Sequence, residues 1–493
     1  MASYVPFDWQ GLGAVLTFVS SVSSLAVDTF FGKGKKKTKL PTGPPGYPLI
    51  GNLTSLGASP HLKLTEWRKD YGDIYRIRMG LQDAVVINGY DAIREELVKK
   101  GDRLSDRPYM YVLHELSCGG KGIGFASYND EYKNRRKAMV SILRRFGMGK
   151  GFMEEQIHEE VLELKKNFAE HAASGEAFDP SPLLGCSVLN VICSMILGAR
   201  FEQDDPLFHR LVALMDRTVA AMGPSQILNV FPWLRYLPGV GQTGSDVIGC
   251  AEEIREFLSG VIREQRSQLN NNDDVSFVQS LEAALKDDDQ VTMIMQDLFI
   301  GGAETTTTTL RWALLYLALH PEVQENMQTE LDREVGRERR PSLTDKPRLP
   351  YTEASILEIQ RVRTIAPLSI PHAASQDVEL RGYHIPAGTQ VLVNLWSVHM
   401  DPAHWTDPDR FDPTRFLNEQ GKVVRHEQFL PFSIGRRQCP GEQLAKTELF
   451  LFLTTLLQHF TFELPEGAPP STEGVMGISL SPSSYKICVR PRD

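Results

Sequence analysis

The sequence PFSIGRRQCPGE, residues 431–442, surrounds one cysteine with prolines, glycines and arginines. An apolar, helix-forming run, EQLAKTELFLFLTTLLQHF, overlaps its end. We therefore expect Cys439 just before a helix N-terminus, where the helix dipole and free backbone N–H groups favour a thiolate. Gly435 and Gly441 permit a tight turn and the close approach of a planar group. Arg437 can pair with a carboxylate on that group.

A thiolate ligand of haem iron meets each of these demands, and it pushes electron density toward the metal, which favours O–O cleavage. The alternative is a buried, inert cysteine. That alternative does not account for the spacing of Phe432, Gly435, Arg437, Cys439 and Gly441, which reads F-x-x-G-x-R-x-C-x-G. The sequence therefore predicts a haem-thiolate centre with Cys439 as the axial iron ligand.

The composition is that of a globular protein, with 493 residues of which 42% are hydrophobic and 23% charged. A net charge of −9 gives no sign of nucleic-acid binding. The six cysteines have no C-x-x-C spacing and are too sparse for a disulfide scaffold. We expect the five cysteines other than Cys439 to be reduced, small hydrophobic residues.

The N-terminal region has the pattern of a membrane anchor. Residues 11–31 are largely apolar, and five lysines follow between Lys33 and Lys39, ahead of a proline-rich stretch. Lysines after the apolar run predict an anchor at 1–31 with the protein body in the cytosol, and a stiff basic linker at 32–50. A signal peptide would carry its basic residues first, and a mitochondrial presequence would be rich in arginine. A buried core helix stays open as an alternative, because the run is weaker than an ordinary membrane span.

Residues 51–493 show no break in composition, which predicts one haem-binding catalytic domain. The early runs 74–79 and 83–89 have the composition of strands, and a second strand-like patch begins at 378. Helical apolar spacing recurs in 154–172, 251–269 and 321–335. The expected fold is mainly α with a small β portion.

One predicted helix contains residues of low helix propensity. Residues 293–320 have a helical pattern that Pro321 ends, yet Gly301 and Gly302 lie in the middle. Each glycine costs ~1 kcal/mol against alanine in a helix interior. Five β-branched threonines, 305–309, follow the glycines and are poor helix formers. Such local cost usually accompanies a functional gain.

Two interpretations of this helix stay open. The Thr305 hydroxyl can bond the Gly301 carbonyl four residues back and bend the helix, which would open a notch lined by that hydroxyl and by Glu304, a proton source. The glycines could instead serve a tight helix–helix crossing through small residues. The segment alone does not choose between these interpretations.

Glu358 and Arg361 lie three residues apart on a probable helical face, and a proline-rich stretch, 408–416, carries Arg415. Ion pairs of this spacing are common and mostly solvated. One glutamate and two arginines can nevertheless form a buried lock between a helix and an irregular loop. The loss of one partner would then leave a buried charge unpaired.

Taken together, these motifs resemble the cytochrome P-450 monooxygenases, in particular the second family of the animal microsomal type. The resemblance covers nearly all of the chain. It rests on LPTGPPGYPLIGN at 40–52, G-G-x-E-T at 301–305, E-x-x-R at 358–361, P-x-x-F-x-P-x-R-F at 408–416 and the cysteine loop. The last four of these stretches are motifs in the expected order, which makes the resemblance specific. It implies the cytochrome P-450 fold, preceded by the membrane anchor.

The resemblance implies roles for individual residues. Cys439 would be the proximal ligand of haem b (iron protoporphyrin IX), within a loop shaped by Phe432, Gly435 and Gly441. Thr305 and Glu304 would line the proton path to the dioxygen site, and Glu358, Arg361 and Arg415 would form the structural lock. The haem propionates would meet Tyr132, Arg136, His372, Arg437 and Arg107. Tyrosine stands at 132 where the family has tryptophan, but a phenol can donate one hydrogen bond as an indole does.

The implied reaction inserts one oxygen atom of dioxygen into a lipophilic substrate, such as a steroid, fatty acid or xenobiotic. The chain has no flavin or nicotinamide fingerprint, so its electrons would come from NADPH through the NADPH–cytochrome P-450 reductase, with cytochrome b5 as a second donor. The implied location is the endoplasmic reticulum membrane, with the catalytic domain facing the cytosol. The basic cluster Lys133, Arg135, Lys137, Arg144 and Arg145 is either a docking site for an acidic partner or a solvated helix face.

The expected substrate pocket is mostly apolar, which favours lipophilic substrates. Its expected lining residues are Phe299, Ala303, Ile365, Leu368, Ser369 and Ile478. Residues 231–234 (FPWL) either dip into the bilayer or pack in the core. Two other function classes are a haem-thiolate isomerase or dehydratase and a non-catalytic haem sensor. Neither needs the pair Glu304 and Thr305, so the pair argues against both.

Overall fold

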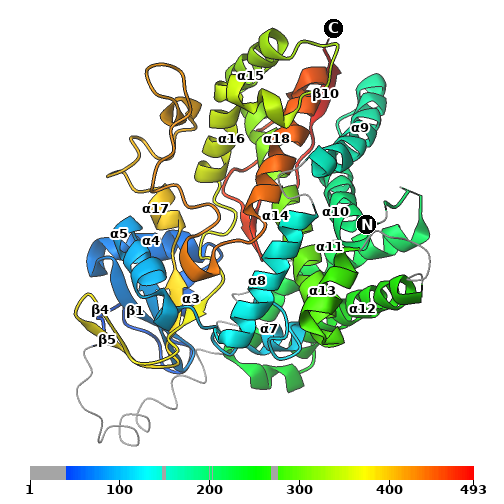
Figure 1. Ribbon diagram of the computed structural model, residues 1–493. Coiled ribbons are helices and arrows are strands. Elements are labelled where there is room, and N and C mark those ends of the chain that lie inside the picture. Colours follow the sequence, from blue (N-terminus) through cyan, green and yellow to red (C-terminus); the bar gives the residue numbers. More distant parts are fainter. Residues whose placement is uncertain (1–39, 147–150, 199, 203, 268–275, 493) are drawn as a thin grey trace, which may run out of the picture.

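The computed structural model describes residues 40–146, 151–198, 200–202, 204–267 and 276–492. The predicted anchor at 1–31 and the basic part of the linker lie outside the described residues. Within the described ranges, no helix is long and apolar enough to cross a membrane. Figure 1 shows a helical body on the right and a smaller β-rich part on the left. The predicted fold class, mainly α with small sheets, is confirmed.

The β-rich part joins segments that are far apart in the sequence. Strand β1 (Ile74–Met79) pairs antiparallel with β2 (Gln82–Ile87), which lies parallel to β6 (Gln390–Val393). The short β3 (His372–Ala373) pairs with the other edge of β6. Three two-stranded sheets complete the β structure: β4 (Val378–Leu380) with β5 (Tyr383–Ile385), β7 (Phe460–Glu463) with β10 (Cys488–Pro491), and β8 (Val475–Met476) with β9 (Leu480–Ser481).

The helical body is built around two buried helices, α14 (Asp288–Leu319) and α18 (Glu442–His459). The other long helices are α4 (Pro60–Tyr71), α8 (Asp130–Arg145), α9 (Gly151–Ser174), α10 (Ser181–Leu197), α11 (Pro206–Val230), α12 (Val240–Ser267), α13 (Phe277–Leu285), α15 (Pro321–Glu334) and α16 (Pro350–Val362). The short α-helices are α3 (Leu53–Leu56), α5 (Tyr90–Arg94), α6 (Gly101–Leu104), α7 (Tyr111–Leu116) and α17 (Trp396–His399). A π-helical turn η1 (Glu95–Lys99) and 3₁₀ turns η2 (Pro232–Tyr236), η3 (Leu343–Arg348), η4 (Pro413–Phe416) and η5 (Gly435–Arg437) complete the described elements.

Helix α14 runs through the main core and has clear end signals. The Asp287 side chain caps its start by accepting from the Gln290 N–H, and the helix ends at Leu319, two residues before Pro321. Near its C-terminal end, Trp312 Nε1 donates to the Leu480 carbonyl at 2.8 Å. This bond fastens strand β9 to the helix that carries the glycine–threonine segment.

Candidate active site

The cysteine loop, residues 431–441, contains the 3₁₀ turn η5 and leads into helix α18. Gly435 has φ +83°, and a Cβ at this position would lie 2.1 Å from the Leu97 carbonyl oxygen in η1. Both the left-handed backbone and the close packing therefore require glycine. The Cys439 N–H donates to the Phe432 carbonyl at 3.0 Å, which closes the loop. A Cβ on Gly441 would lie 3.9 Å from Cys439 Sγ, an ordinary contact, so packing does not require that glycine.

The thiol of Cys439 is surrounded by groups that suit an anion. Burial raises its pKa and the charge of Glu442 adds to the rise, whereas the backbone N–H groups of Gly441 and Glu442 and the charge of Arg136 oppose it. Cys439 is nevertheless exposed. Burial also raises the pKa of Cys193, and no hydrogen-bond donor opposes that rise. The donors and the access make Cys439 the cysteine best suited to bind a metal.

The buried Arg437 of the loop and the half-buried Arg107 lie close together. Arg437 donates to the Ser105 carbonyl at 2.8 Å, and Arg107 donates to the Gly124 carbonyl at 2.9 Å. Burial and the charge of Arg437 lower the pKa of Arg107 to about 9, and burial also lowers that of Arg437. Asp106 offsets only part of this positive charge. Two carboxylates, such as haem propionates, would neutralise the rest, so the residues present fit the group that the sequence predicts.

Tyr132 and His372 also lie near these arginines, but their polar atoms form hydrogen bonds with backbone carbonyls. The Tyr132 ring lies over the Arg437 guanidinium, 3.9 Å from its centre, and its hydroxyl donates to the Arg436 carbonyl at 3.4 Å. His372 Nδ1 donates to the Leu104 carbonyl at 2.8 Å. Burial lowers the pKa of His372 to about 3, so its Nε2 carries no proton. Propionate bonds from these two residues stay predictions, as does one from Arg136, which here donates to the Gln438 carbonyl.

The glycine–threonine segment of α14 combines both interpretations that the sequence left open. Thr305 Oγ1 donates to the Gly301 carbonyl at 2.7 Å, as predicted. A methyl group on Gly301 would meet nothing within 4 Å, which is consistent with a notch. A Cβ on Gly302 would instead lie 2.6 Å from Ile192 Cδ1 on α10, which is a tight helix crossing. Gly301 therefore leaves free space beside the helix, whereas Gly302 allows α14 to pack closely against α10.

Glu304 points toward the hairpin formed by β8 and β9. Its Oε1 accepts hydrogen bonds from Ser479 Oγ at 2.9 Å and from Thr308 Oγ1 at 3.2 Å. Burial raises the pKa of Glu304, and both hydrogen bonds oppose the rise. Sequence analysis missed both donors. Thr308 lies four residues after Glu304 on the same helical face and could have been found, but no local signal identifies Ser479.

Sequence analysis also missed Glu448, a buried acid within the apolar run of α18. Thr306 Oγ1 donates to Glu448 Oε2 at 3.1 Å and so bridges α14 and α18. Glu448 Oε1 has no hydrogen-bond partner among the described residues. Burial raises the pKa of Glu448 to about 8. The available signal was one charged residue in TELFLFL, where burial favours apolar side chains.

We expect Glu448 to make the protein less stable as pH rises. Between its usual pKa of 4.5 and its folded pKa of about 8, the folded protein binds one more proton than the unfolded chain. The free energy of unfolding therefore falls through that window, by about 4 kcal/mol at this site. Glu448→Gln should remove this fall, and the exposed Glu473→Gln should keep it. Urea unfolding at pH 5 and pH 8 measures both, and equal pH dependence in wild type and Glu448→Gln would contradict the assignment.

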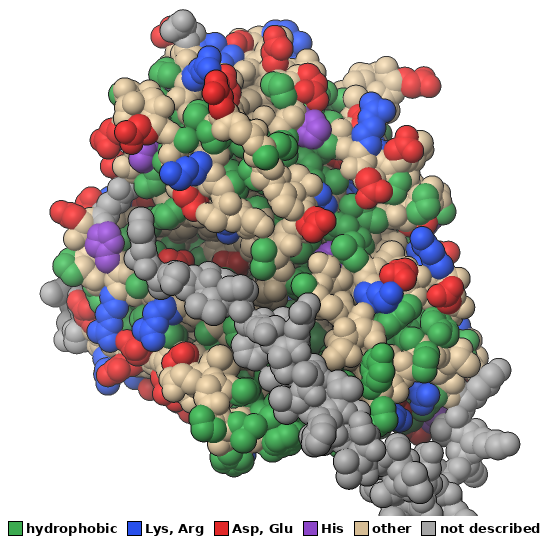
Figure 2. Space-filling model, turned by 180° about the vertical axis from the view of Figure 1, so that it is seen from behind, with side chains coloured by type: hydrophobic (Ala, Val, Ile, Leu, Met, Phe, Trp, Pro, Cys, Tyr) green, Lys and Arg blue, Asp and Glu red, His purple; other side chains and the backbone are tan. Residues whose placement is uncertain are grey.

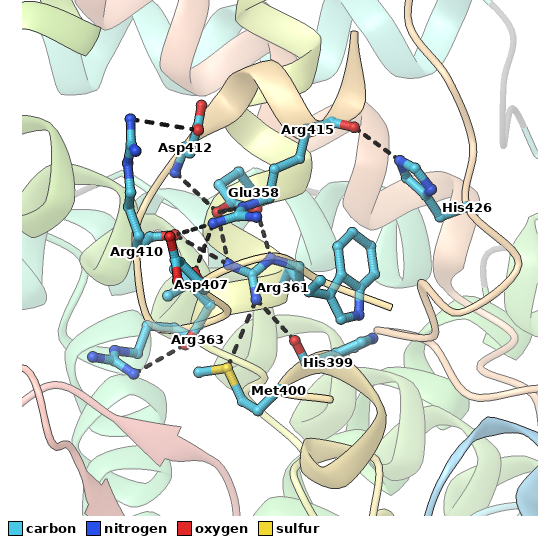
Figure 3. Close-up of polar contacts among 12 residues, drawn as sticks. Glu358, Arg361, Arg363, His399, Met400, Asp407, Arg410, Asp412, Arg415 and His426 are labelled. Carbon is cyan, nitrogen blue, oxygen red and sulfur yellow. Dashed lines mark hydrogen bonds and ion pairs between the residues drawn. The ribbon is translucent and has the colours of Figure 1, made fainter. Parts of the chain in front are cut away.

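The predicted structural lock is assembled as Figure 3 shows. Arg361 donates through Nε and Nη2 to the two Glu358 oxygens, each at 2.7 Å, and both side chains are completely buried. Arg415 Nε reaches Glu358 Oε1 at 3.2 Å, and the Asp412 N–H donates to the same oxygen at 3.0 Å. One carboxylate thus fastens helix α16 to the irregular chain around η4.

His399 connects this lock to the cysteine loop. Its carbonyl accepts from Arg361 Nη1 at 2.8 Å, and its Nε2 accepts from the Leu430 N–H at 2.8 Å. Nδ1 therefore carries the proton and donates to Thr364 Oγ1 at 2.6 Å. Burial lowers the pKa of His399 to about 3, which keeps the ring neutral. The lock thus holds the residue that precedes the cysteine loop.

The predicted pocket residues do not form one cluster. Phe299 and Ala303 lie in the main core, and Ile365 packs against it. Ile478 packs against a second cluster formed by α7, α11 and α12, and Leu368 packs against the sheet. Ser369 has φ +55° in the turn that carries these residues away from α16. The lining that the sequence predicts therefore spans three packing clusters.

The predicted basic cluster on α8 is smaller than expected. Arg135 is only 4% exposed and donates to the backbone carbonyls of Gly120 and Lys121, so its prediction as a surface residue is wrong. It lies on the inner face of the helix. Lys133 is exposed but forms an ion pair with Asp130 at 2.9 Å.

The alternative that residues 231–234 pack in the core is wrong for Trp233. This side chain is 60% exposed, and Tyr236 and Leu237 after it are exposed as well. Arg235 lies over the rings of Tyr111 and Tyr236, which joins η2 to α7. Hydrophobic side chains also gather along the lower edge of the molecule in Figure 2. The connection between α11 and α12 therefore presents aromatic side chains to the surroundings.

Comparison with known proteins agrees with this geometry. A family model described as Cytochrome P450 matches residues 41–489. Cytochrome P450 2U1 of Bos taurus is 39% identical over 463 residues, which cover 90% of this chain and 83% of the relative. Cytochrome P450 2D4 of Rattus norvegicus is 38% identical, covering 95% of this chain and 96% of the relative. Cytochrome P450 2J2 of Homo sapiens is 38% identical, covering 95% and 94%. The chain belongs to the cytochrome P450 family and is a monooxygenase.

Proposed function

We propose that this chain holds haem b through Cys439 and inserts one oxygen atom of dioxygen into a lipophilic substrate. The observation that carries the proposal is the accessible Cys439 thiol, which has backbone donors at the start of α18 and lies near Arg437 and Arg107. Haem supplies dioxygen binding and O–O cleavage, which no side chain of the protein supplies. Arg437 and Arg107 would hold the propionates, with Arg136 as a further contact.

The chain's own residues would deliver protons and line an apolar substrate site. Thr305 and Glu304 are adjacent residues of α14, and burial raises the pKa of Glu304, which favours the protonated acid. A protonated carboxyl beside a hydroxyl can release a proton to the notch at Gly301. The apolar side chains of Phe299, Ala303 and Ile478 favour a substrate such as a steroid, fatty acid or xenobiotic.

We further propose that electrons come from NADPH through the NADPH–cytochrome P-450 reductase, with cytochrome b5 as a second donor. Lys137 and Arg436 belong to α8 and the cysteine loop and would contribute to docking an acidic partner. The lysine pattern of the sequence and the exposed Trp233 and Tyr236 support a location at the endoplasmic reticulum membrane. The corresponding division is an anchor at 1–31, a linker at 32–50 and a catalytic domain at 51–493.

Reconstitution with the reductase tests this function. NADPH oxidation is measured with and without steroids, fatty acids and retinoid-like lipids, and products are screened by mass spectrometry. We expect one lipid to accelerate NADPH oxidation and to gain one oxygen atom. An isomerase or dehydratase would convert a lipid without NADPH, and a sensor would convert none. Either result would contradict the proposal.

Thr305→Ala should uncouple electron use from product formation. Without the hydroxyl, the proposed proton path from Glu304 to the notch lacks one member, so we expect product per NADPH to fall about tenfold to a hundredfold while NADPH oxidation continues. Thr305→Ser retains a hydroxyl and should recover most of the yield. Product and hydrogen peroxide are measured against NADPH consumed. An unchanged yield in Thr305→Ala would exclude a role for this hydroxyl.

A further inference from the structure

A row of hydroxyl groups connects Glu304 to a half-buried part of the β8–β9 hairpin. Ser479 and Thr308 donate to Glu304 Oε1. Ser481 Oγ lies 3.2 Å from Ser479 Oγ and 3.3 Å from Thr308 Oγ1. Thr308 is 1% and Ser479 3% exposed, whereas Ser481 is half-buried. The row therefore leads from the partly accessible hairpin to the buried acid on α14.

Hydroxyl groups suit proton transfer, because each one donates one proton and accepts on two lone pairs. The separations of 3.2–3.3 Å are longer than the ~2.7–2.8 Å of an optimal O–H···O bond. Only some of the bonds can form at one time, and rotation of the hydroxyls selects which. Such a row can pass a proton along and then return to its first arrangement.

The electrostatic surroundings of Glu304 also favour this use. Burial is the main cause that raises its pKa, and the charge of Asp216 adds to the rise. The hydrogen bonds from Ser479 and Thr308 and the charge of Arg311 lower it. If Glu304 gives up its proton, it has to regain one before the next cycle. The groups that donate hydrogen bonds to its carboxyl are the hydroxyls of Ser479 and Thr308, so they are placed to return that proton.

We infer that Ser481, Ser479 and Thr308 form a relay that returns protons from solvent to Glu304. The inference rests on the proposed role of Glu304 as the proton donor at the notch. A hydronium ion at Ser481 gives up one proton and becomes water. Each hydroxyl in use accepts one proton and releases its own, and Glu304 Oε1 gains one, so no electron moves. The three hydroxyl residues act through Glu304 and are positioning residues.

Attachment of the hairpin to α14 does not by itself explain the row. Trp312 Nε1 donates to the Leu480 carbonyl at 2.8 Å, and Arg311 Nη2 donates to the Pro482 carbonyl at 3.2 Å. These bonds flank Ser481 on both sides and hold the hairpin without any of the three hydroxyls. Loss of one hydroxyl should therefore leave the hairpin in place.

Proton exchange at Glu304 tests the relay directly. The full-length ferric haem protein is transferred into D₂O, and the infrared C=O band of the protonated Glu304 carboxyl, assigned by its loss in Glu304→Gln, is followed over time. Because Ser481 reaches Glu304 through either Ser479 or Thr308, we expect exchange at least about tenfold slower in Ser481→Ala and in the double variant Ser479→Ala/Thr308→Ala than in wild type. Ser481→Thr keeps a hydroxyl and should restore the rate. Ser484→Ala removes an exposed hydroxyl of the same segment and should match wild type.

Equal exchange rates in wild type and both alanine variants would overturn the relay. An absent Glu304 band in wild type would overturn it as well, because the acid would then hold no proton at rest. The measurement needs neither reductase nor substrate, so a failure to oxygenate lipids would refute the proposed function separately. A purely structural role would lower the thermal stability of the alanine variants and leave their exchange rates unchanged.

Discussion

Glu358→Ala is expected to lower the free energy of unfolding by about 3–5 kcal/mol, because it leaves the buried Arg361 guanidinium without its carboxylate. Arg415 loses the same partner, and the Asp412 N–H loses its acceptor. A loss of this size is a large part of the unfolding free energy of a typical domain, so little folded protein should accumulate. Urea unfolding followed by circular dichroism measures the loss, and soluble yield gives a second estimate.

An exposed ion pair of the same spacing provides the control. Lys63 Nζ lies 2.8 Å from Glu66 Oε1, also three residues apart, but Glu66 is 60% exposed. Glu66→Ala should change the free energy of unfolding by less than about 0.5 kcal/mol, because water solvates the remaining lysine. Similar losses of unfolding free energy in Glu358→Ala and Glu66→Ala would show that burial is not the reason why the Glu358 lock stabilises the protein.

Cys439→Ser is expected to abolish oxygenation while leaving the fold intact. Oxygen replaces sulfur with little change of shape, but a serine hydroxyl does not ionise near neutral pH and is a harder ligand than a thiolate. The bond that closes the loop runs from the Cys439 N–H to the Phe432 carbonyl and does not involve the side chain. Product formation should fall to the level of haem-free protein, with the free energy of unfolding changed by less than about 1 kcal/mol.

Cys118→Ser is the matched control, because Cys118 is another accessible thiol. It lies between α7 and α8, outside the cysteine loop, and its replacement should leave product formation unchanged. A comparable loss of product in both variants would mean that general thiol chemistry, rather than iron ligation at position 439, is needed.

The sequence predicted those parts of the site whose geometry is set by nearby residues. The Thr305–Gly301 bond follows from a four-residue spacing in a helix, and Gly435 follows from a tight turn. The lock was also predictable, because Glu358 and Arg361 share a helical face. Arg415 could be named only as a possible third partner, since it comes from a loop far along the chain.

Contacts between distant segments could not be predicted in this way. Glu448 meets Thr306 across 142 positions, and Ser479 meets Glu304 across 175. No local spacing links such residues, because packing of α18 and the β8–β9 hairpin on α14 creates the contacts. The error at Arg135 has a related cause, since a run of basic residues does not tell which of them faces the protein interior.

The reduced, carbon-monoxide-treated protein tests the central claim most directly, because its Soret band reports the atom bound to the iron. A thiolate from Cys439 predicts a strongly red-shifted Soret band in wild type and in Cys118→Ser, and the loss of that band in Cys439→Ser. A wild-type protein without the red-shifted band, or a Cys439→Ser protein that retains it, would contradict iron ligation by Cys439.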